Sequence, residues 1–234
     1  LGRGLLGAAL VFLSCGLAGA AGHLNVITIE GSINPASADY LIEAIRTSEA
    51  DGAAALLIEL DTPGGLVSSS QDIIKAMLNS EVPTIVYVTP RGAWAASAGM
   101  FLTIAANLAA MTPGSSIGAA HPVSIGGGGG APVGEDGEGA ARDVSMEKAE
   151  NLLASYVESI AKHRKRNVEW VVDAVRDSVA VDAEQARELG VIDFVAADRS
   201  ELLALVEGRE LEMPGGVVTL SLKGVPVKNL EMSL

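Results

Sequence analysis

Residues 54–78 read AALLIELDTPGGLVSSSQDIIKAML and combine three signals that together indicate the fold. The first seven residues form an almost continuous apolar run, which is typical of a strand buried on both faces of a sheet. The run ends in the turn DTPGG at 61–65, and residues 67–78 follow with apolar side chains at helical spacing. A buried strand, a glycine turn and a helix in this order predict a parallel α/β protein with helices on both faces of the sheet.

The same alternation of strand and helix runs through the rest of the chain. Apolar runs at 25–31, 84–88 and 108–111 indicate further strands, and spaced apolar positions indicate helices at 36–48, 97–106, 145–164, 168–177 and 182–189. The tail at 216–234 alternates weakly and is interpreted as a hairpin. The chain shows no internal repeat, so we expect one α/β domain.

One segment of about twenty residues interrupts this pattern. Residues 124–143 contain five consecutive glycines at 126–130, then charged side chains, and carry no periodic apolar signal. A connection of this length without secondary structure is typically a functional lid or a disordered segment. We therefore expect a mobile loop that acts as a lid.

Composition excludes several classes of protein. The 234 residues carry 16 Lys and Arg against 29 Asp and Glu, a net charge of −13, and 49% are hydrophobic. This hydrophobicity excludes a disordered chain, and the acidic balance makes nucleic acid an unsuitable partner. The single cysteine, Cys15, excludes an internal disulfide framework and a multi-cysteine metal site. We expect no metal and no cofactor.

The N-terminal segment reads as a targeting sequence. Arg3 precedes residues 4–22, which carry no charge and include the small-residue run Ala18-Gly19-Ala20. A basic start, an apolar stretch and small residues at the end are typical of a secretory signal peptide. An uncleaved membrane anchor is the alternative, since nineteen uncharged residues can span a bilayer. In both cases residues 1–22 place the domain at 23–234 outside the cytoplasm.

Ser97 is the candidate nucleophile. It lies in the stretch GAWAASAGM at 92–100, between a strand and a predicted helix, where free backbone N–H groups face a ligand. A helix-capping serine is the alternative interpretation. The turn at 61–65 lies at the carboxyl end of a strand, where parallel sheets bind ligands, and its glycine pair can supply an N–H group to an oxyanion. A plain turn is again the alternative.

The general base has two candidates. Lys148 lies at the start of the 145–164 helix, and steps of four lead from it to Leu152 and Tyr156, so its side chain is expected to point toward the core. Burial and the positive end of a helix both lower the pKa of a lysine. The alternative is an exposed lysine at the end of the stripe. His121, before Pro122, is the second candidate, whereas the basic run at 162–166 is expected to be a solvated helix end.

Four motifs in order resemble the Clp-protease/crotonase superfamily. They are DTPGG at 61–65, AASAG at 95–99, PGSSIGAA at 113–120 and AEQARELGVID at 183–193. The pattern is most similar to the long form of the NfeD family of membrane-bound, Clp-class serine proteases, over about residues 24–232. The resemblance implies repeated ββα units with a parallel sheet flanked by helices. It also implies membrane helices and a small soluble domain after this domain.

The resemblance further implies a Ser-Lys dyad, with Ser97 as nucleophile and Lys148 as base. The oxyanion would be held by the backbone N–H groups of Gly65 and Ala98. Clp-type peptidases keep a histidine close to the position of His121, 24 residues after Ser97. A triad of Ser97, His121 and either Asp173 or Asp177 is therefore the alternative.

The same resemblance suggests the substrate and the partners. An apolar groove formed by Gly64, Val67 and Met100 would favour hydrophobic peptide segments, and those of stomatin-like membrane proteins are the expected substrates. The domain is expected at the cell membrane on its extracytoplasmic side, as a homodimer or a higher homo-oligomer. Two alternatives belong to other classes of protein: an inactive scaffold that binds membrane proteins, and an acyl-CoA enzyme that uses the same oxyanion hole.

Overall fold

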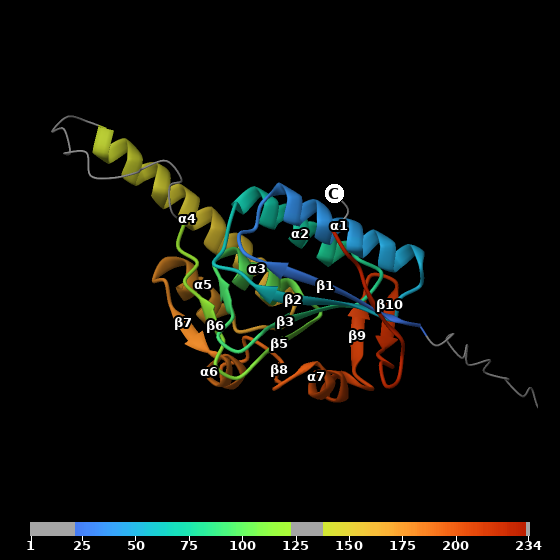
Figure 1. Ribbon diagram of the computed structural model, residues 1–234. Helices are drawn as coiled ribbons and strands as arrows, with labels where there is room; N and C mark the ends of the chain where they lie inside the picture. Colours follow the sequence, from blue (N-terminus) through green and yellow to red (C-terminus); the bar gives the residue numbers. More distant parts are fainter. Residues whose placement is uncertain (1–21, 123–137, 233–234) are drawn as a thin grey trace, which may run out of the picture.

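A computed structural model describes residues 22–122 and 138–232 (Figure 1). For residues 138–145 it describes the backbone, and for the others in these ranges the side chains as well. Its main element is a six-stranded sheet in the order β11-β1-β2-β3-β5-β8, in which every neighbouring pair is parallel. The strands are β1 (Leu24–Glu30), β2 (Ala55–Asp61), β3 (Thr84–Val88), β5 (Leu108–Met111), β8 (Phe194–Val195) and β11 (Val227–Asn229). The predicted α/β fold with a parallel sheet is confirmed.

The sheet is covered on both faces because its strands are apolar on both. In β2 the side chains of Leu56, Ile58 and Leu60 belong to one buried cluster, and those of Ala55 and Leu57 belong to a second. Successive strand residues point to opposite faces, so one continuous apolar run supplies both cores. The burial of β2 therefore follows directly from the pattern in its sequence.

Seven helices are seen in the described residues. They are α1 (Pro35–Ala50), α2 (Val67–Asn79), α3 (Ala98–Ala105), α4 (Glu138–His163), α5 (Val168–Arg176), α6 (Ala183–Glu188) and α7 (Arg199–Val206). α1 and α2 cover one face of the sheet, and α7 lies on the other (Figure 1). The N-terminal half of α4 projects beyond the other described elements (Figure 1). None of the helices in the described ranges is long and apolar enough to cross a membrane.

A small second sheet carries the region around Ser97. Its strands are β4 (Trp94–Ala96), β6 (Ser116–Gly118) and β7 (Ala180–Asp182), with β4 parallel and β7 antiparallel to β6. An isolated parallel bridge joins Thr62 to Ala95, so the turn after β2 meets this sheet. The 61–65 turn and the segment before α3 are thereby held side by side.

Two expectations about connections need correction. Of the loop expected at 124–143, residues 124–137 lie outside the described residues, but 138–143 are helical because α4 begins at Glu138. The hairpin expected at 216–234 is formed instead by β9 (Glu210–Met213) and β10 (Gly216–Thr219). The end of the tail joins β1 as the parallel edge strand β11. The targeting sequence expected at 1–22 lies almost wholly outside the described residues.

Candidate active site

Ser97 occupies a strained position between β4 and α3. Its φ is +50°, a region that residues with a side chain rarely adopt, and such strain persists only where the surroundings enforce it. Its N–H donates to the carbonyl of Gly118 at 2.9 Å, which joins it to the end of β6. Ser97 is the N-cap residue of α3, yet its hydroxyl makes no capping hydrogen bond. The hydroxyl of this half-exposed residue is therefore available for chemistry.

The glycine turn lies directly against Ser97. Gly64 has a φ of +117°, and a Cβ atom there would lie 2.9 Å from the Cβ and 3.4 Å from the Oγ of Ser97. The turn is held by Thr62, whose Oγ1 accepts the N–H of Gly64 at 3.1 Å and donates to its carbonyl. Gly99 in α3 approaches Thr62 so closely that a Cβ there would lie 2.5 Å from its methyl group. Small residues thus allow the turn and α3 to pack around the serine.

Two backbone N–H groups beside Ser97 lack a partner among the described residues. The neighbours of Gly65 are engaged, because Ile33 donates to the carbonyl of Gly64 and Leu66 donates to that of Ile33, at 2.8 and 2.9 Å. The N–H of Gly65 itself has no acceptor there. Ala98 opens α3, where an N–H has no intrahelical acceptor. A pair of free donors next to a free hydroxyl is the arrangement that binds an oxyanion.

Lys148 does not face the core, and that expectation is wrong. Its side chain is exposed, and Leu152 one turn later is 70% exposed. The buried face of α4 is instead formed by Leu153, Ala154, Val157, Ile160 and Ala161. The expected stripe fails because the N-terminal half of α4 projects beyond the elements that could bury it (Figure 1). Within the described side chains no hydrogen bond joins Lys148 to Ser97.

His121 is held by a backbone carbonyl rather than by a carboxylate. Its Nδ1 lies 3.0 Å from the carbonyl oxygen of Val175 near the end of α5, so Nδ1 carries a hydrogen and donates it. Neither Asp173 nor Asp177 binds the imidazole in the part of the chain that the structure describes. The alternative Ser-His-Asp triad is therefore not formed.

Exposed apolar side chains lie on the segments that surround the serine. Val67 is 42% exposed and Leu66 is 37% exposed, directly after Gly65. Trp94 in β4 is 56% exposed, and sequence reasoning missed it although it precedes Ser97 by three residues. Met100 is fully buried, so the expectation that it lines a substrate groove is wrong. It lies in a helix whose side chains are all in the core.

The sequence profile of the family "NfeD1b, N-terminal domain" matches residues 23–214. The chain belongs to this family. The membrane-bound protease PH1510 of Pyrococcus horikoshii is 34% identical to it over 210 residues, which are 89% of this chain and 45% of that protein. The membrane protein NfeD1b of Bacillus subtilis is 28% identical over 191 residues, 76% of this chain and 40% of the relative. The chain thus spans less than half the length of the curated relatives it matches.

Solved structures of the relative share this fold. A serine-to-alanine mutant of 1510-N, a membrane-bound stomatin-specific protease, superposes with a TM-score of 0.81 at 33% identity, covering 92% of this chain and all of that one. A lysine-to-alanine mutant of 1510-N in complex with a substrate peptide gives a TM-score of 0.78 at 33% identity, with 92% and 94% covered. The second structure shows that the relative's domain accommodates a peptide.

Arg166 is buried and Arg164 is half-buried, although the basic run at 162–166 is expected to be solvated. The side chain of Arg166 is 4% exposed and pairs with Asp193 at 2.8 Å. Arg164 donates from Nε to the carbonyl of Ala105 at 2.8 Å. Burial, with a smaller contribution from the charge of Arg166, lowers the pKa of Arg164 to about 10. The contact of Arg164 with the end of α3 joins residues that are far apart in the sequence, so the sequence pattern does not predict it.

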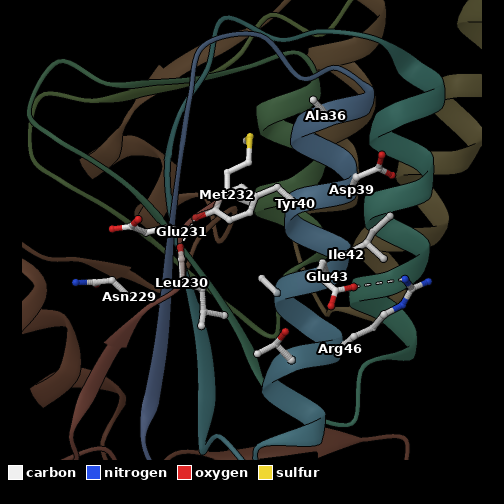
Figure 2. A pocket seen from close by; sticks show the side chains of 12 residues that line it. Ala36, Asp39, Tyr40, Ile42, Glu43, Arg46, Asn229, Leu230, Glu231 and Met232 are labelled. Carbon is white, nitrogen blue, oxygen red and sulfur yellow. Dashed lines mark hydrogen bonds and ion pairs between the residues drawn. The ribbon is translucent and has the colours of Figure 1, made fainter. Parts of the chain in front are cut away.

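A groove of about 960 Å³ lies elsewhere, between α1 and residues 229–232 (Figure 2). The hydroxyl of Tyr40 donates to the carbonyl of Leu230 across it. Its lining includes none of the predicted site residues. This groove is therefore separate from the site around Ser97.

Proposed function

We propose that this domain is a serine peptidase in which Ser97 attacks the substrate carbonyl. The observation that carries the proposal is the free hydroxyl of Ser97, held with a φ of +50° against the Gly64 turn beside the unpaired N–H groups of Gly65 and Ala98. A structure of the relative 1510-N with its serine replaced, and one with a lysine replaced and peptide bound, support the same assignment.

The chemistry proceeds through an acyl-enzyme. Ser97 Oγ attacks the peptide carbonyl carbon while its proton passes to the neutral amine of Lys148, and the oxyanion accepts hydrogen bonds from Gly65 and Ala98. The carbon–nitrogen bond then breaks, and the leaving amine takes the proton from the Lys148 ammonium. Water attacks the ester, gives a proton to Lys148, and the proton returns to Ser97 Oγ as the acid product leaves.

Lys148 must leave solvent for this mechanism to operate. Only the neutral amine of a lysine can accept a proton, and desolvation favours that neutral form. A bound apolar peptide can exclude water around the amine once Lys148 reaches Ser97. Peptide binding and formation of the dyad are therefore coupled in this proposal.

The proposed substrate is a hydrophobic segment of a stomatin-like membrane protein. Leu66, Val67 and Trp94 supply exposed apolar contacts on segments next to the serine, with Gly64 leaving space for the peptide backbone. The relative 1510-N is a stomatin-specific protease, which supports the same class of substrate. The domain acts at the membrane, on its extracytoplasmic side, and as a homodimer or higher homo-oligomer.

Hydrolysis of an apolar peptide from a stomatin-like protein tests the proposal. Ser97→Ala and Lys148→Ala should each lower kcat/KM by at least about 1,000-fold, because the two groups act as one unit. Lys162→Ala is the matched control, since this exposed lysine of α4 pairs with Glu158 one turn away and with no other acidic side chain that the structure describes. Full activity in the Ser97 variant would overturn the assignment.

A binding scaffold is the second candidate, and the exposure of Lys148 is the observation that favours it. In that case the wild-type domain binds the peptide with no turnover, and Ser97→Ala binds it equally well. Calorimetry on the wild-type domain and this variant, with product analysis by mass spectrometry, separates the two functions.

A further inference from the structure

The helices that carry the two proposed catalytic side chains meet at one junction. α3 begins directly after Ser97 and ends at Ala105, and α4, which carries Lys148, ends at His163. Immediately after α4, Arg164 donates to the carbonyl of Ala105 at 2.8 Å and Arg166 approaches that of Ala106 at 3.5 Å. The last carbonyls of a helix lack intrahelical donors, so both cations bind groups that need a partner.

Arg166 extends the junction into the main sheet. Its guanidinium binds Asp193 at 2.8 Å, and the same carboxylate accepts the N–H of Ala109 in β5 at 2.7 Å. Asp193 also donates its own N–H to the carbonyl of Ala109 at 2.9 Å. The end of α4 is therefore tied to α3 and to the sheet at once.

Arg164 remains charged at neutral pH. Burial and the neighbouring Arg166 lower the pKa of Arg164 only to about 10, well above physiological pH. Placing two like charges close together, one of them buried, is unfavourable, so their contacts must offset that cost. Here the contacts connect elements 59 residues apart in the chain.

The geometry of α4 makes this junction matter for Lys148. Sixteen residues separate Lys148 from Arg164, which is about 24 Å along a helix at 1.5 Å per residue. Val157 and Ile160 pack on the core near the C-terminal end of α4, which is the base of the helix. Lys148 and Leu152 are exposed on the projecting half. A tilt of about 10° at the base would move Lys148 by roughly 4 Å over this length, more than a hydrogen bond tolerates.

We infer that Arg164 and Arg166 are positioning residues that fix the direction in which α4 presents Lys148 relative to Ser97. The inference rests on the proposed function, in which Lys148 is the base. The arginines act through α3 and α4 and do not touch the substrate.

Steady-state kinetics on the full chain gives the first test. Arg164→Ala should lower kcat by at least 10-fold and change KM by less than 2-fold, because the segment at 64–67 keeps its contacts. Arg164→Lys, which retains a cation able to donate to Ala105, should recover most of kcat. Lys165→Ala, which removes the adjacent exposed lysine and its pair with Glu212, should match the wild type. Equal loss in the Lys165 variant, or none in the Arg164 variant, would overturn the inference.

A distance measurement gives the second test and does not depend on activity. In a Cys15→Ser background, spin labels at Leu152→Cys on α4 and Lys75→Cys on α2 should give a narrow distance distribution. Arg164→Ala should broaden it at least 2-fold while the circular dichroism spectrum stays unchanged. Arg164→Met, which keeps the bulk of the side chain without its donors, replaces the alanine variant if that variant does not fold. An unchanged distribution contradicts the inference, whereas activity of Lys148→Ala would contradict only the proposed base.

Discussion

The backbone of Gly64 lies so close to Ser97 that a Cβ atom on it would approach the Cβ of Ser97 to 2.9 Å. Gly64 also has a φ of +117°, which side chains rarely tolerate. The serine and the glycine turn are therefore packed against each other, and a side chain at position 64 would displace the side chain of Ser97.

Gly64→Ala should abolish the reactivity of Ser97. The methyl group displaces the serine side chain and strains the turn, so we expect kcat/KM to fall by more than 100-fold in a peptide hydrolysis assay, about 3 kcal/mol of transition-state stabilisation. Gly114→Ala is the matched control, since its φ is +82° but nothing lies within 4 Å of its new methyl group. If both variants lose activity equally, backbone strain rather than contact with Ser97 is the cause.

His121→Ala should leave hydrolysis within about 3-fold of the wild type, an effect far smaller than the loss of a general base. Nδ1 of His121 donates to the carbonyl of Val175, and no carboxylate orients the ring among the described side chains. The pH profile of kcat/KM in this variant should keep the shape of the wild-type profile. Loss of activity on the scale of Ser97→Ala would instead support the Ser-His-Asp alternative.

Asp193→Ala should destabilise the fold through Arg166. The buried guanidinium loses its carboxylate, and we expect the free energy of unfolding in urea to fall by about 2 kcal/mol. Glu212→Ala provides the comparison, because it removes an ion pair whose side chains are 75% and 78% exposed. Exposed pairs of this kind contribute about 0–1 kcal/mol to stability. An equal loss of stability in the two variants would therefore contradict the claim that the buried Arg166–Asp193 pair stabilises the fold.

Asp51 should make stability depend on pH in the acidic range. Burial alone raises the pKa of Asp51, but hydrogen bonds from Lys228, Asn25 and His23 outweigh it and hold the pKa below its ordinary value. A carboxyl with a lowered pKa stabilises the folded state above its unfolded pKa, near 4, and this contribution is lost as pH falls through the folded value. Asp51→Asn should therefore flatten the decline of unfolding free energy below about pH 4. A decline as steep as that of the wild type would rule out Asp51 as its source.

Four strands of the main sheet, β1, β2, β3 and β5, could be predicted because local patterns determine them, whereas β8 and β11 could not. The apolar run before the turn at 61–65 has the length and continuity of a strand buried on both faces, and it forms β2 as expected. The strands β4, β6 and β7 have three residues each, too few for a periodic signal, and only their pairing defines them. Ser97 could be proposed as the nucleophile from its sequence context, whereas its φ of +50°, beside Gly64 and bonded to Gly118, has no signal in the sequence.

The helix that carries Lys148 shows what sequence patterns leave open. Steps of four residues connect Lys148 to Tyr156, but the same helix also offers a neighbouring stripe through Leu153 and Val157, and this second stripe is the buried one. Periodicity cannot indicate where α4 leaves the body of the protein. Arg164 was missed for a related reason: the carbonyl that it binds lies 59 residues away in the chain, and no local pattern indicates such a contact.

The site of covalent modification by a fluorophosphonate tests the central claim most directly. Mass spectrometry of the treated wild-type domain should locate one adduct on the peptide that contains Ser97. The adduct should be absent from Ser97→Ala and should form at least 100-fold more slowly in Lys148→Ala at neutral pH. An adduct on another residue, or undiminished labelling of Ser97→Ala, would contradict the assignment of Ser97 as the nucleophile.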